Sequence, residues 1–108
     1  MSEDTIDLNA LAEGIREPWQ RVDVVSVNDA IVRMAMAHGE FPWHHHEEDE
    51  FFLCWSGSLR IEREGEDSVS LSPGQVFVVP RGVRHRPVAD EPAVAVMIER
   101  PETKQYGE

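Results

Sequence analysis

The strongest constraint on the fold is an alternation of apolar and polar residues that begins near residue 19 and recurs along the chain. Successive side chains of a β-strand point to opposite faces, so this alternation is typical of strands with one buried face. The runs are rich in Val, Ile and Phe and are separated by turn residues, for example at Asn28-Asp29 and Glu91-Pro92. They read QRVDVVSV, AIVRMAMA, EFFLCWSGSLRIERE, SVSLS, QVFVVP and AVAVMIE. About eight short strands at such spacing predict an all-β sandwich or barrel.

The chain length suits one domain, since 108 residues lie within the roughly 50 to 200 residues that a single core supports. We expect an N-terminal arm or short helix over residues 1–18, a barrel over 19–100 and a C-terminal tail over 101–108. The tail, PETKQYGE, is polar, and we expect it to fray or pack loosely. The helix is indicated by apolar residues at three- and four-residue spacings, namely Ile6, Leu8, Leu11, Ala12 and Ile15.

The charge of the chain excludes some classes of partner. With 21 acidic and 10 basic residues the net charge is -11, which repels nucleic acid and anionic membrane surfaces. The single cysteine, Cys54, has no internal partner, and the N-terminus lacks the basic and apolar regions of a signal peptide. No apolar run approaches the ~20 residues that cross a bilayer. These features favour a cytoplasmic protein that binds neither nucleic acid nor membrane.

The stretch FPWHHHEEDEFF, residues 41–52, carries the densest chemistry. On a strand His44 and His46 share one side, while His45 faces the other. Glu50 follows at the start of the next strand pattern and offers a carboxylate, so two imidazoles and one carboxylate can form a facial metal site with open positions. A solvated charged corner is the alternative, whereas an internal run between two strand patterns is no tag remnant.

A further histidine, His85, stands far away in the sequence, in PGQVFVVPRGVRHRP. A turn at residues 80–82 reverses the chain, so His85 begins a strand whose inner face it can share with the first cluster. Three imidazoles and one carboxylate suit one divalent ion of Fe, Mn, Ni, Co, Cu or Zn, and ligand softness does not choose among them. Alternatively, a lone histidine of this kind is a hydrogen-bonded core or surface residue.

Together the two segments resemble the two motifs of the cupin superfamily. The first is GEFPWHHHEEDEFFLCWSG, residues 39–57, and the second is GQVFVVPRGVRHRPVA, residues 74–89. Four residues instead of five follow Gly39, and Ala89 stands where the family has Asn. Neither departure touches a ligand position. The chain is therefore similar to small single-domain cupins of the mannose-6-phosphate-isomerase-like kind.

The resemblance implies a β-barrel, also described as a double-stranded β-helix or jelly roll, with a metal inside. By the same resemblance, the ligands are His44, His46, Glu50 and His85. It further implies a homodimer, because small cupins commonly dimerise. His38 and His45 are expected to be exposed and not to bind the metal.

Strand parity separates the residues that follow Glu50. Phe52 and Cys54 should face the barrel interior, where a small core residue is a better interpretation of Cys54 than a fifth ligand or a nucleophile. The opposite parity gives an outward apolar patch that a homodimer partner or the N-terminal segment must cover, made of Phe51, Leu53 and Trp55.

The only basic concentration lies around His85 and consists of Arg81, Arg84 and Arg86. A guanidinium binds carboxylate or phosphate in a fork, so these residues are candidates for a substrate anchor. Pairing with the acidic corner at residues 47–49 is the favoured alternative.

Two functions remain open on this basis. The first is a metalloenzyme that acts on a small oxygen-bearing molecule, by dioxygenase or by isomerase or lyase chemistry. The second is a non-catalytic module that binds a small molecule or a metal. A third alternative, a barrel that has lost its metal, is disfavoured because all four ligand types are retained.

Overall fold

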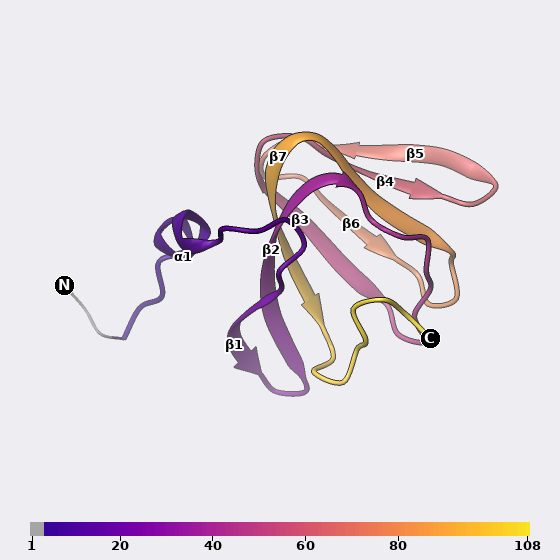
Figure 1. The fold of residues 1–108 in the computed structure, drawn as a ribbon. Coiled ribbons are helices and arrows are strands. Elements are labelled where there is room, and N and C mark those ends of the chain that lie inside the picture. The colour runs from indigo at the N-terminus through magenta and orange to yellow at the C-terminus, as the bar shows by residue number, and fades with distance from the viewer. Residues whose placement is uncertain (1–3) are drawn as a thin grey trace.

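The computed structural model describes residues 4–108, so the first three residues of the expected N-terminal arm lie outside it. Within that range it confirms an all-β fold with a short N-terminal helix (Figure 1). The elements are α1 (Leu8–Gly14), β1 (Val22–Val27), β2 (Ala30–Glu40), β3 (Glu50–Ser56), β4 (Leu59–Arg63), β5 (Glu66–Leu71), β6 (Val76–Val79) and β7 (His85–Glu99). In the same range no helix is long and apolar enough to cross a membrane.

The long strand β7 holds the sheet together, because it pairs with three other strands, all antiparallel (Figure 1). Its first residues, from His85 to Val88, pair with β4, and the residues from Val94 to Ile98 pair with β3. Along most of its length it also pairs with β2, and the strand order is β1-β2-β7-β3-β6, with β4 joining β7 to β5. This curled sheet brings β3 and the start of β7 toward one interior.

The sequence predicted a turn at Glu91-Pro92 that would separate two strands, and this prediction is wrong. The chain on both sides of Pro92 belongs to the single strand β7. Ala37 pairs with Ala93 and Gly39 with Ala89, so residues 90–92 lie opposite His38 alone. This is an exposed bulge, which bends a strand without reversing it. Proline is tolerated there because its missing N–H would have had no partner in the ladder.

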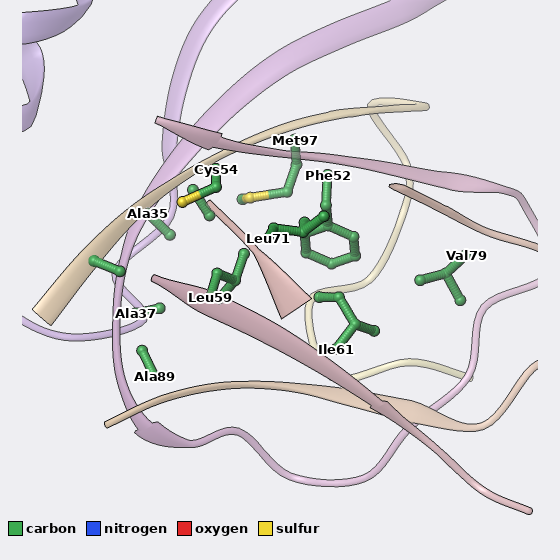
Figure 2. Packing of buried hydrophobic residues seen from close by; sticks show 12 residues of the cluster. Ala35, Ala37, Phe52, Cys54, Leu59, Ile61, Leu71, Val79, Ala89 and Met97 are labelled. Carbon is green, nitrogen blue, oxygen red and sulfur yellow. The ribbon is translucent and has the colours of Figure 1, made fainter. Parts of the chain in front are cut away.

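The apolar core fills the interior of the barrel (Figure 2). Phe52 and Cys54 point into it, as parity predicted, and Cys54 is fully buried. Gly57, the last residue of the first motif, closes the turn after β3 with a φ of 80°, and a Cβ there would lie 2.9 Å from the Cβ of Ala93. The main members of the core are Ala35, Ala37, Phe52, Cys54, Leu59, Ile61, Leu71, Val79, Ala89, Ala95 and Met97.

The helix α1 stands outside the barrel, and an extended link connects it to the strands (Figure 1). Asp7 caps α1, since its carboxylate accepts hydrogen bonds from the backbone N–H groups of the first turn. The Trp55 indole donates to the Asn9 side chain at 2.8 Å, and the Trp19 backbone N–H donates to Met36 at 2.8 Å. The N-terminal segment therefore contacts Trp55 at the edge of the outward patch.

Of the two expectations for the C-terminal tail, fraying or loose packing, fraying is wrong, while most of its residues stay exposed or partly exposed. Thr103 is buried, and the ring of Tyr106 stacks on Phe41 with centroids 5.0 Å apart. The backbone N–H of Glu108 donates to His45 at 3.0 Å. At Gly107, with a φ of 85°, a Cβ would meet the histidine segment at 2.5 Å. The tail packs because its aromatic ring and backbone groups find partners beside the first histidine motif.

Candidate metal centre

Two segments far apart in sequence meet in an antiparallel bridge between His44 and His85. The backbone N–H of His44 donates to His85 at 3.0 Å, and that of His85 donates to His44 at 2.8 Å. His46 follows one pleat further on, and Glu50 begins β3. The four side chains are buried, and one donor atom from each lies within 4.8 Å of the others.

Backbone carbonyl groups fix the ring orientations of His44 and His85. His44 Nδ1 lies 2.8 Å from the carbonyl of Pro42, and His85 Nδ1 lies 2.9 Å from the carbonyl of Val83. A carbonyl oxygen only accepts, so Nδ1 carries the proton in both rings and the lone pair is on Nε2. This is the arrangement by which carbonyls commonly orient metal-binding histidines.

A group of buried polar atoms has no hydrogen-bond partner among residues 4–108. It includes His46 Nε2, His85 Nε2 and Glu50 Oε1. The carboxylate oxygen lies 3.3 Å from the first nitrogen and 3.4 Å from the second, without hydrogen-bond geometry. An unsatisfied buried polar atom costs about 1 to 3 kcal/mol. A divalent transition ion would accept these lone pairs, so the residues fit a metal.

The protonation states of His44 and Glu50 also suit an ion. Burial lowers the pKa of His44 to about 4, so the ring is neutral at pH 7. Burial alone would raise the pKa of Glu50, but the imidazoles of His46 and His85 beside it lower the pKa below its ordinary value. Burial opposes charge on His46 as well, yet Glu50 raises the pKa of His46, so an ion that binds this ring has to displace a proton. An ionised carboxylate and neutral imidazoles are the forms that bind metals.

The other predicted positions lie outside this group. His38 is exposed, and His45 takes part through its backbone, where its carbonyl accepts from Glu108. Neither residue belongs to the four whose donor atoms converge. His45 is half-buried under the tail, not exposed as expected.

The basic residues around His85 have acidic neighbours of their own. Arg84 pairs with Glu64 at 3.1 Å, and Arg86 pairs with Glu62 and stacks over Trp43. The predicted pairing with the acidic corner is wrong for these two guanidiniums. Arg81 does contact that corner, through its backbone N–H and the Asp49 carboxylate.

Sequence reasoning missed Glu99, a buried acid beside the centre. Its Oε2 accepts from Arg33 at 2.6 Å and from Arg21 at 2.9 Å. Burial and the neighbouring Glu50 raise the pKa of Glu99 to about 7, against the two guanidiniums. Parity could have found it, because Glu99 is the acidic residue on the inward face of AVAVMIE, in step with Ala95 and Met97.

A small cavity of about 40 Å³ adjoins His44 and Glu50. Its walls are otherwise mostly apolar, from residues such as Ala35, Phe52 and Met97, while Trp19, Arg21 and Gln105 also line it. A cavity with apolar walls and a few polar groups is the usual form of a small-molecule site. The centre therefore has room for a small ligand at its side.

Residues 30–99 match the protein family described as "Cupin domain". The chain belongs to the cupin family. The cupin-2 domain protein from Shewanella frigidimarina has the same fold, with 30% identity, a TM-score of 0.85, and 89% of this chain and 94% of that one covered. The uncharacterized protein YdbB of Bacillus subtilis (strain 168) is 33% identical over 81 residues, which are 74% of this cupin and 72% of YdbB.

A third similar protein has a named activity. It is the hydroquinone 1,2-dioxygenase PnpCD, solved in complex with Cd²⁺ and 4-hydroxybenzonitrile. The identity is 21%, the TM-score is 0.76, and 94% of this cupin and 74% of that chain are covered. At that identity the likeness establishes the common fold alone.

Proposed function

We propose that this cupin is a small-molecule metalloenzyme that holds one divalent transition ion with His44, His46, Glu50 and His85. The observation that carries the proposal is the convergence of buried, unpartnered nitrogen and oxygen atoms at one point. The ion would supply Lewis-acid or redox chemistry to a bound substrate. Fe, Mn, Ni, Co, Cu and Zn all suit the donor set.

The chain's own residues would position the substrate. The carbonyls behind His44 and His85 hold the rings with Nε2 toward the centre, which keeps the site preorganised. The apolar side chains of Ala35, Phe52 and Met97 keep water from the ligand. A reaction of the dioxygenase or of the isomerase or lyase class is proposed from the cupin resemblance, which includes a hydroquinone dioxygenase among proteins of the same fold.

The second candidate is a non-catalytic module. It is favoured because the described cavity wall offers no side chain, apart from the proposed ligands, that could act as a base. Apart from the proposed ligands His44 and Glu50, the ionisable residue on the described wall is Arg21. A guanidinium stays protonated in proteins and does not serve as a base. An isomerase usually needs a group that accepts and returns a proton, so this wall also suits a protein that only binds a small molecule or a metal.

We further propose a homodimer in the cytoplasm, without a nucleic acid or membrane partner. Support for the dimer comes from the apolar residues Val76 and Val78 on β6, which are 53% and 45% exposed. Light scattering coupled to gel filtration measures the mass in solution. A monomer at all concentrations would contradict the dimer.

A turnover screen tests the enzyme proposal against the module. The metal-free protein is loaded anaerobically with Fe(II), Mn(II), Ni(II) or Zn(II) and mixed with diketones, thiols, phenols or sugar phosphates. Metal-dependent oxygen uptake or product formation supports the enzyme, and His46→Ala should abolish it while His45→Ala retains it. Tight ligand binding without product in every form would support the module.

A further inference from the structure

Arg21 is a cavity residue to which the proposed function gives no role. It directly precedes β1 and lines the same cavity as His44 and Glu50. Its Nη1 donates to Glu99 at 2.9 Å and to the Thr103 carbonyl at 3.1 Å, which uses both hydrogens of that nitrogen. Nε and Nη2 have no partner within residues 4–108. One edge of the guanidinium, with three N–H donors, is therefore free.

The position of Arg21 suits ligand recognition. The Arg21 side chain is 23% exposed and also lines an open groove on the outer side, together with Trp19 and Gln105. Its ion pair with Glu99, which lies beside Glu50, and its bond to Thr103 in the packed tail hold it in place. Arg21 thus stands between solvent and the metal centre, in a fixed orientation.

Buried charge gives an independent reason for an anionic ligand. Even with both carboxylates ionised, Glu50 and Glu99 do no more than offset Arg21 and Arg33 when no ion is bound. A divalent ion adds two positive charges that no further buried acid of this cluster offsets. Asp23, the other partner of Arg33, is 67% exposed and screened by water. Uncompensated buried charge is costly, so a ligand that brings negative charge into the cavity is favoured.

We propose that Arg21 is the specificity-determining residue of the cavity and selects small organic acids. Such a ligand places one oxygen-bearing group at the metal centre and a carboxylate on the Nε and Nη2 edge of Arg21. That edge matches a carboxylate with two parallel hydrogen bonds. Ala35 and Phe52 make the wall between these two positions apolar, so the ligand should have a short hydrocarbon chain between its two polar groups. The inference rests on the proposed function, because the first group needs the ion.

The experiment compares succinate with succinamate, in which an amide of the same shape replaces one carboxylate. Each is titrated into Co(II)-loaded protein, and binding is read from the visible spectrum of the cobalt and from calorimetry. We expect wild type to prefer succinate by about tenfold or more, equal to about 1.4 kcal/mol. Arg21→Gln should reduce the preference to about onefold. Arg84→Gln, which removes an exposed guanidinium paired with Glu64, should leave it unchanged.

Arg21→Lys serves as a second variant if the glutamine variant does not fold. Lysine keeps the charge but lacks the fork, so the preference should fall by about threefold or more. A preference that is absent from wild type, or that persists in the Arg21 variants, overturns the inference while leaving the metal centre intact. Failure of wild type to take up cobalt overturns the proposed function and this inference with it.

Discussion

Replacing Arg33 with methionine should destabilise the fold strongly. The Arg33 side chain is 7% exposed, and its guanidinium donates to Glu99 at 2.6 Å and to Asp23 and the Pro101 carbonyl at 2.8 Å. Methionine keeps the apolar stem but leaves Glu99 with Arg21 as its remaining cation. Breaking a buried ion pair costs about 3 to 5 kcal/mol. We expect about 3 kcal/mol, because Arg21 still pairs with Glu99 and the exposed Asp23 contributes little.

The loss should grow with pH because Glu99 titrates. Its pKa is raised from 4.5 to about 7 by burial and by Glu50, so its stabilising contribution is complete below pH 4.5 and is lost as pH rises through 7. Arg33→Met removes a cation and raises that pKa further, so the variant loses stability more steeply at high pH. Near pH 5.5 the carboxyl is neutral, and the cost should be about 1 to 2 kcal/mol.

Urea unfolding of the metal-free proteins, followed by tryptophan fluorescence near pH 5.5 and pH 8, measures both effects. Arg84→Met is the matched control, since that side chain is 51% exposed and should change the unfolding free energy by less than about 0.5 kcal/mol. A loss below about 1 kcal/mol for Arg33→Met near pH 8, or the same loss at both pH values, would refute the reasoning.

Three further changes have defined outcomes. Gly57→Ala should cost about 2 kcal/mol or more in urea unfolding, because it places a Cβ 2.9 Å from that of Ala93 at a φ of 80°; an unchanged midpoint would contradict this geometry. Tyr106→Ala should cost about 1 kcal/mol through loss of the stack on Phe41, whereas a neutral result would mean that the tail does not pack in solution. His44 in metal-free protein should stay neutral down to about pH 4, so its contribution to stability is lost as pH falls from 6.5 to 4. NMR titration of its ring checks this, and protonation near 6.5 would contradict its burial.

Strand alternation made much of this structure predictable. The two-residue alternation of a strand predicted that Phe52 and Cys54 point into the barrel. It also predicted that His44 and His46 lie on the side opposite His45. The resemblance to two family motifs then placed His85 with the first cluster. In the structure an antiparallel backbone bridge joins His44 and His85. The inward and outward positions depend on local geometry, which a sequence expresses directly, whereas the pairing of His44 with His85 was reached through the two-motif resemblance.

The features that sequence reasoning missed depend on tertiary partners. Pro92 marks a turn in most contexts, but here it lies in a bulge whose flanks stay paired with β2. The tail is polar by composition, yet Tyr106 finds Phe41 across the fold. Arg21 and Glu99 are 78 residues apart and become a pair only when β1 and β7 are in place. No local pattern encodes such distant contacts.

The metal content of untagged protein tests the proposed centre most directly. Wild type and His45→Ala should each carry about one transition ion per chain by elemental mass analysis, because His45 does not belong to the converging group. His46→Ala and Glu50→Gln should lose the ion or hold it far more weakly, since each removes a buried donor. Equal metal in all four proteins, or none in wild type after reconstitution with each candidate ion, would contradict the assignment of this site.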